Sequence, residues 1–101
     1  MNRMNDYQAI ANAYRQTLPD EFDQAWIEAV VYRGASDLKF FCEDKTGIFQ
    51  PEMPASVGFD IHRALLSAVT TIRPLETDGE KRYCTFHLYQ DGRFKLDLRD
   101  D

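Results

Sequence analysis

Two histidines and two cysteines are the residues of this sequence best suited to ligate a metal or to act as base and nucleophile. Cys84 and His87 are three residues apart in a strand-like segment, where such side chains point to opposite faces and cannot share one ion. His62 lies in a separate, helix-like segment, and Cys42 has no histidine beside it. We therefore expect no metal site, no cofactor and no catalytic residue. Both cysteines are interpreted as reduced, buried thiols, with a disulfide as the alternative.

Binding of nucleotides or nucleic acid is not indicated either. The five glycines, at positions 34, 47, 58, 79 and 92, never form a phosphate-binding pattern. The formal charge is −5, from 17 acidic and 12 basic residues, whereas phosphate backbones attract clustered Lys and Arg. The aromatic residues Trp26, Phe40, Phe86 and Phe94 fit core positions and have no basic residues interleaved with them as a stacking platform would. We expect no direct contact with nucleic acid.

The remaining polar signal is acidic. A net-negative surface attracts basic proteins and speeds their association, and a solvated surface that keeps the protein soluble is the simpler alternative. The acidic residues gather at several places, namely Asp20, Glu21 and Asp23; Glu43 and Asp44; Asp60; and the terminal Asp97, Asp100 and Asp101.

The hydrophobic pattern predicts the elements that position these residues. Apolar residues three and four apart predict a helix over residues 6–18, ended by Pro19. A second helix is expected from Ser56, as its capping residue, to Ile72, with Pro74 closing it. Runs of β-branched and aromatic residues predict strands over residues 25–33 and 38–43, followed by a short third strand near residues 48–50.

The last segment predicts a hairpin with one buried face. Apolar residues alternate with polar ones over residues 83–89 and 94–98, and Gln90-Asp91-Gly92 forms the turn between them. The whole chain, residues 1–101, has the length of a single domain. We expect an α+β fold in which an antiparallel four- to five-stranded sheet carries two helices on one face, in the order α-β-β-(β)-α-β-β.

Several stretches resemble the YezG-like immunity proteins, small antidotes to bacterial polymorphic and contact-dependent growth inhibition toxins. The resemblance covers most of the chain. It includes the opening helical segment with Pro19, the strand that begins at Trp26, the strand over residues 38–43 and the closing hairpin over residues 83–97. Three departures are that Phe22 and Trp26 are offset after the Leu-Pro step, that Cys84 stands where a tryptophan is commoner, and that the chain end lacks an aromatic residue.

The resemblance implies a non-enzymatic antitoxin with one cognate toxin, and a basic nuclease is the toxin class we expect. Blockage of its active site by an acidic surface would be the mechanism. Because hairpin tips and chain ends project, we predict that the toxin contacts Asp91, Asp97, Asp100 and Asp101. The sequence begins without the apolar stretch of a signal peptide and has no run of about 18 apolar residues. We therefore expect a cytoplasmic protein that does not enter membranes.

Two other functions remain open. The chain could be a small enzyme or ligand-binding domain whose site forms only in three dimensions, near the connection from Pro51 to Pro54 or around His62 or His87. It could also be a subunit of a larger assembly, in which the edge of the short third strand pairs with a strand of a partner.

Overall fold

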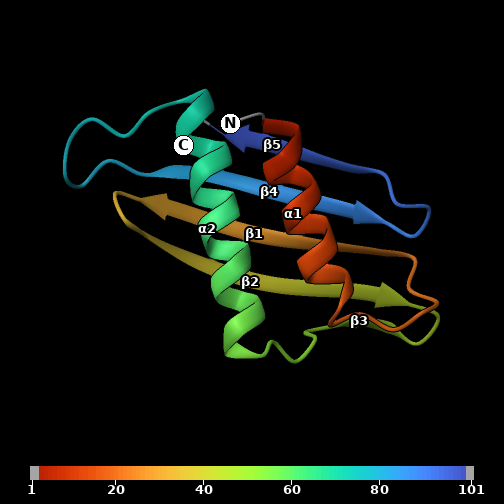
Figure 1. The fold of residues 1–101 in the computed structure, drawn as a ribbon. Coiled ribbons are helices and arrows are strands. Elements are labelled where there is room, and N and C mark those ends of the chain that lie inside the picture. The colour runs from red at the N-terminus through yellow and green to blue at the C-terminus, as the bar shows by residue number, and fades with distance from the viewer. Residues whose placement is uncertain (1–2, 100–101) are drawn as a thin grey trace.

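A computed structural model describes residues 3–99 as two helices and one five-stranded sheet. Along the chain the elements are α1 (Arg3–Arg15), β1 (Gln24–Tyr32), β2 (Ala35–Asp44), β3 (Gly47–Phe49), α2 (Ala55–Ile72), β4 (Arg82–Tyr89) and β5 (Phe94–Arg99). The strands lie in the order β3-β2-β1-β4-β5, and every neighbouring pair is antiparallel. Both helices lie side by side across one face of the sheet (Figure 1). The predicted α+β fold is confirmed, and the sheet has five strands.

The helix boundaries differ from those predicted at three of the four ends. α1 ends at Arg15, three residues before Leu18, because residues 16–18 form tighter turns in which each amide donates to the carbonyl three residues earlier. The Thr17 hydroxyl also donates to the Tyr14 carbonyl, at 2.8 Å. The expectation that Ser56 caps α2 is wrong: Pro54 is the capping residue, and Ser56 lies inside the helix. The end of α2 at Ile72 agrees with the prediction.

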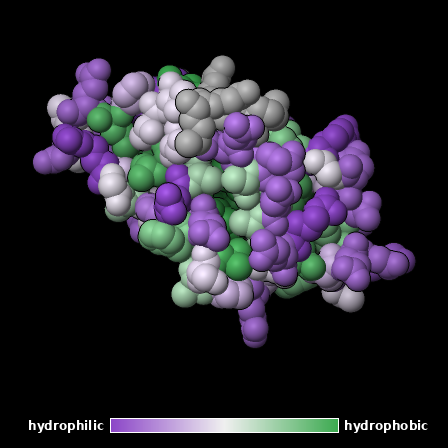
Figure 2. All heavy atoms as spheres, in the orientation of Figure 1, coloured by the Kyte–Doolittle hydropathy of each residue, from purple (hydrophilic) through white to green (hydrophobic). Residues whose placement is uncertain are grey.

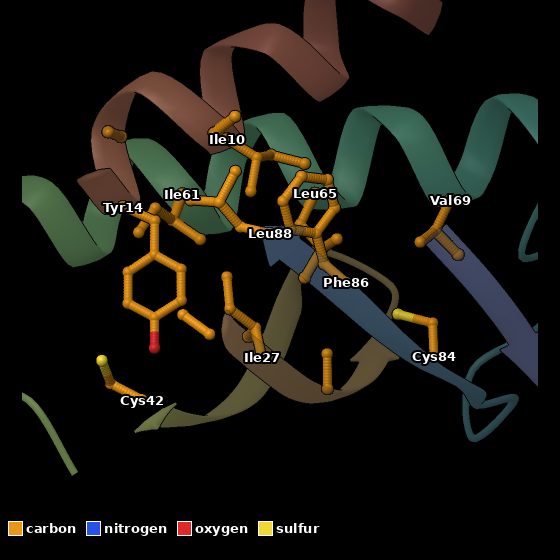
Figure 3. Packing of buried hydrophobic residues seen from close by; sticks show 14 of the residues in the cluster. Ile10, Tyr14, Ile27, Cys42, Ile61, Leu65, Val69, Cys84, Phe86 and Leu88 are labelled. Atoms are coloured by element: carbon orange, nitrogen blue, oxygen red, sulfur yellow. The ribbon is translucent and has the colours of Figure 1, made fainter. Parts of the chain in front are cut away.

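The core lies between the sheet and the helices. The alternation of the strands turns every second residue of β1 toward the helices, so Ala25, Ile27, Ala29 and Val31 are at most 3% exposed. β4 contributes Cys84, Phe86 and Leu88 in the same way. Figure 3 shows these strands packed against buried side chains of both helices, namely Ile10 and Tyr14 of α1 and Ile61, Leu65 and Val69 of α2.

The Tyr14 side chain connects α1 to strands β1 and β2 of the sheet. Its side chain extends from the helix toward Cys42 (Figure 3), and its hydroxyl donates to the carbonyl of Phe41 at 2.7 Å. A second, longer contact reaches the carbonyl of Trp26 at 3.4 Å. Burial raises the pKa of the Tyr14 phenol well above its ordinary value. The hydroxyl therefore stays protonated and keeps its role as a donor.

The two cysteines are buried and are not joined in a disulfide. Burial raises the pKa of Cys42 and of Cys84 to about 11, so both thiols stay protonated near neutral pH. This agrees with the interpretation of both residues as small buried hydrophobes. Neither α1 nor α2, the helices within residues 3–99, is long and apolar enough to cross a membrane.

Candidate interaction surface

Of the four residues predicted to contact a toxin, Asp91 lies at the tip of the hairpin between β4 and β5. Its carboxylate accepts hydrogen bonds from the Arg93 amide at 3.0 Å and from Arg93 Nε at 2.7 Å. The hydrogen bond from the Arg93 amide is the main cause that lowers the pKa of Asp91. Asp91 therefore stabilises the turn that displays it, in addition to being exposed there.

Asp97 lies farther along β5, opposite Thr85 of β4. Its carboxylate is 3.4 Å from His87 Nε2 and 3.6 Å from Lys95 Nζ. Lys95, Asp97 and Arg99 point to the same side of β5, so the charge along this strand alternates. The structure does not bring Asp91 and Asp97 together, and Asp100 and Asp101 lie outside the described residues. A role for these four residues in toxin binding stays a prediction.

A larger gathering of carboxylates forms where β1 begins and β2 ends. The Asp23 amide donates to the Glu43 carbonyl at 2.8 Å, and the Gln90 amide donates to the Asp23 carbonyl at 3.2 Å. These two bonds hold the segment before β1, the end of β2 and the β4–β5 turn at one end of the sheet, which Figure 1 shows on the right. We call this group the acidic end, and its members are Asp20, Glu21, Asp23, Glu43, Asp44 and Asp91.

The acidic end carries more negative than positive charge. Its basic neighbours are Arg15, which donates to the Gln90 carbonyl at 3.5 Å, with Lys45 and Arg93 in the adjoining turns. Hydrogen bonds from Thr46, chiefly from its hydroxyl, lower the pKa of Asp44. Seen from the helix side, hydrophilic residues cover this end of the molecule (Figure 2). The sequence showed these residues to be acidic, but only the fold brings the three segments together.

The face of the sheet opposite the helices carries aromatic side chains. The indole of Trp26 stacks on Phe41, with ring centroids 5.4 Å apart and an angle of 16° between the planes. The His87 and Tyr89 rings are stacked at 6.4 Å on the neighbouring strand β4. We call this surface the open face; in addition to these four residues it holds Gln24, Glu28, Val30, Tyr32, Asp37, Lys39, Glu43, Tyr83, Thr85, Lys95, Asp97 and Arg99.

The position of Trp26 corrects one prediction. Trp26 was expected in the core, but it is half-buried on the open face. Its neighbours Ala25 and Ile27 take the two core positions, and a strand cannot turn adjacent side chains to the same side. The sequence contains a signal for this arrangement. Ala25 and Ala29 alternate with Ile27 and Val31 at every second position, so all four belong to the same side of the strand. Such small residues fit beneath helices that lie close to the sheet.

Two shallow depressions lie next to each other on the open face. The larger, of about 400 Å³, is lined by residues of β1, β4 and β5 that include Trp26, Glu28, Thr85 and Asp97. The smaller, of about 190 Å³, reaches Asp37 and Lys39 of β2. Glu28 and Arg99 line both depressions. Glu28 and Arg99 therefore lie where the two depressions of the open face meet.

One arrangement relevant to catalysis appears elsewhere. The hydroxyl of Ser36 in β2 is 2.6 Å from Nδ1 of His62 in α2, which is within reach for a nucleophile and a base. Across residues 3–99 no carboxylate is hydrogen-bonded or ion-paired to His62, and neither residue lines a cavity described above. The contact ties α2 to the sheet. Because the two residues are 26 positions apart in the sequence, no spacing signal could have predicted this pair.

Metal ligation has no candidate within the same span. No three His, Cys, Asp or Glu side chains among residues 3–99 are placed to share an ion. No family model matches the chain, and no curated protein matches it.

Proposed function

We propose that this chain is a cytoplasmic immunity protein that binds one cognate bacterial toxin and neutralises it by covering its active site. A basic nuclease is the toxin class that fits best. The single observation that carries the proposal is the open face with its stacked Trp26 and Phe41, which adjoins the acidic end through Glu43. The resemblance to YezG-like immunity proteins adds to it.

The side chains of the open face are of the kinds that anchor protein complexes. Binding energy in interfaces concentrates in a few Trp, Tyr and Arg residues surrounded by contacts that exclude water. Trp26 and Tyr89 lie on this face, and Arg99 lies over the ring of Tyr83 at 5.8 Å. A standard interface takes roughly 800 Å² from each partner, which is about an eighth of the 6137 Å² of accessible surface. A sheet of this size can supply that area.

The charges favour a protein partner over a nucleic acid. The open face holds Glu28, Asp37, Glu43 and Asp97 against Lys39, Lys95 and Arg99, so it lacks the positive excess that phosphates require. The acidic end beside it would speed encounter with a basic toxin. Inhibition would then be steric and electrostatic, with no covalent bond made or broken.

Two triple variants that remove equal charge test which acidic residues contact the toxin. The first changes Asp20→Asn, Glu21→Gln and Asp23→Asn at the acidic end, and the second changes Glu52→Gln, Asp60→Asn and Glu76→Gln, three exposed carboxylates outside the acidic end and the open face. Binding to the cognate toxin domain, which the proposed function predicts to be encoded beside this gene, is measured as Kd at several salt concentrations. We expect the first variant to bind more weakly and with a shallower salt dependence. Equal changes in both variants would mean that net charge alone acts, and no change in either would remove both groups from the interface.

A second candidate function rests on the edge of the sheet. Ile48 of β3 is 61% exposed, and Phe49 beside it is 36% exposed. Because β3 has a neighbour on one side only, its outer edge could pair with a strand of another subunit. Measurement of the molar mass in solution, with Ile48→Lys as the variant, tests this reading. A monomer at all concentrations would contradict assembly with itself through this edge.

A further inference from the structure

The carboxylates of the open face differ in whether another residue of the chain hydrogen-bonds to them or forms an ion pair with them. Glu43 accepts from Gln24 at 2.8 Å, Asp37 accepts from the Tyr32 hydroxyl at 3.0 Å, and Asp97 has His87 and Lys95 within 3.6 Å. Glu28 is exposed, and no hydrogen bond or ion pair reaches it from within residues 3–99, although Lys39 is its register partner on β2. Glu28 is thus the carboxylate of this face that has no hydrogen-bond or ion-pair partner within residues 3–99.

The space beside Glu28 is shaped by its neighbours in the sheet. On the side of β4 the register partner of Glu28 is Thr85, a short residue, and beyond it lies Asp97 of β5. The three residues line the 400 Å³ depression together with Trp26, which lies two residues before Glu28 on the same side of β1. The short threonine leaves room that a longer side chain would fill.

We infer that this depression receives an arginine side chain of the partner, with its guanidinium against the Trp26 indole and paired to the Glu28 carboxylate. Tryptophan is the aromatic residue that attracts cations most strongly, and a planar guanidinium can stack on a ring while its N–H groups donate in parallel to one carboxylate. The Thr85 hydroxyl and the Asp97 carboxylate supply further acceptors along the same wall.

Other ligand classes match the depression less well. An anion would meet the carboxylates of Glu28 and Asp97, and the guanidinium of Arg99, which also lines the depression, is already placed over the Tyr83 ring. A lysine would carry the charge but could not both stack and donate bidentately. The inference rests on the proposed function, since it names the chemistry by which the toxin would be recognised. It also agrees with the expected basic character of the toxin.

The test uses a probe peptide, acetyl-Gly-Arg-Gly-amide, and needs no toxin. Trp26 is the single tryptophan of the sequence, so its indole N–H gives one NMR signal that reports on this site alone. We expect a saturable shift of that signal with the arginine peptide. The citrulline peptide, which has nearly the same shape without the charge, should bind at least about fivefold more weakly, the factor expected from one exposed charge pair.

Two variants separate the site from general attraction to an acidic protein. Glu28→Gln should weaken binding of the arginine peptide about fivefold, whereas Asp60→Asn, which removes the same charge from an exposed position on α2, should leave it unchanged. An absent shift, or equal shifts with the arginine and citrulline peptides, would overturn the inference. Because the toxin is not used, that result would leave the proposed function to be judged separately, by complex formation with the toxin domain.

Discussion

The indole of Trp26 stacks on the ring of Phe41 on the side of the sheet that the helices leave uncovered, with centroids 5.4 Å apart. Phe41 is the register partner of Trp26 on β2, and His87 is its register partner on β4. Three aromatic rings therefore cross the centre of the open face on three adjacent strands. Large aromatic residues retained outside the core are the strongest sign of an interaction surface in this molecule.

Trp26→Ala should therefore affect binding more than folding. Loss of a central aromatic anchor weakens protein complexes by about 2 kcal/mol or more, while the free energy of unfolding should fall by less than half of what Phe86→Ala costs. Phe86 is fully buried on the adjacent strand, and such a truncation costs about 3–5 kcal/mol. Urea unfolding of both variants measures the comparison. If Trp26→Ala is as destabilising as Phe86→Ala, Trp26 acts as a core residue and the assignment to an interaction surface is contradicted.

The hydroxyl of Tyr14 should contribute measurably to stability. Tyr14→Phe removes the donor to the Phe41 carbonyl, at 2.7 Å, and leaves a carbonyl in the interior without that partner. We expect a loss of about 1–2 kcal/mol in the free energy of unfolding. Tyr83→Phe is the matched control, because Tyr83 is a half-buried residue whose hydroxyl has no hydrogen-bond partner within residues 3–99. Equal losses from both variants would contradict a specific role for the Tyr14 bond.

Glu80 should make stability depend on pH in the acid range. Its carboxylate accepts from the Thr77 hydroxyl at 2.8 Å, from Arg82 at 3.0 Å and from the Thr77 amide at 2.9 Å, and in this order these bonds lower its pKa from 4.5 to about 2. Because the folded pKa is the lower one, the stabilisation is complete above about pH 5 and is lost as the pH falls toward 2.

The difference in Tm between the native protein and Glu80→Gln should therefore be largest at neutral pH and nearly vanish at pH 2. Glu52→Gln serves as the control, because Glu52 is exposed and no hydrogen bond or ion pair reaches it from residues 3–99. A Tm difference for Glu80→Gln that stays constant from pH 7 to pH 2 would contradict this account.

Two glycines should respond to alanine with opposite signs. Gly92 in the β4–β5 turn has a φ of +93°, which side chains disfavour, so Gly92→Ala should destabilise by about 1 kcal/mol. Gly58 lies in α2, and an alanine there meets only the flexible side chain of Met53, at 3.3 Å. Gly58→Ala should stabilise by up to about 1 kcal/mol through helix propensity. Thermal unfolding decides the signs, and a destabilising Gly58→Ala would show that Met53 cannot move.

The fold was predictable because its signals are local. Alternation over residues 83–89 and 94–98 with Asp91-Gly92 between them predicts a hairpin and its buried face, and β4 and β5 form this hairpin. Pro19 and Pro74 marked where helices could not continue. The position of Trp26 could also have been derived from the same alternation, but its hydrophobicity suggested the core. α2 begins before Ser56, at Ala55, because Pro54 takes the capping position.

The candidate surface was less predictable because it is built from contacts between distant segments. The acidic end depends on backbone bonds from Asp23 to Glu43 and from Gln90 to Asp23. In the sequence Asp97 belongs to an acidic chain end, yet in the described structure its carboxylate is 3.4 Å from His87 Nε2 and 3.6 Å from Lys95 Nζ. The register of the strands shows which carboxylates of the open face have a hydrogen-bond or ion-pair partner, and that Glu28 has none within residues 3–99. The sequence alone does not show this.

The central claim, that this chain is an antitoxin, is tested most directly by co-expression with the toxin domain encoded beside its gene, scored by growth and by co-purification of the two chains. We predict that the cells grow and that the two proteins purify as a stable complex. Cells that die despite expression of this chain, or the absence of a toxin gene beside it, would contradict the account.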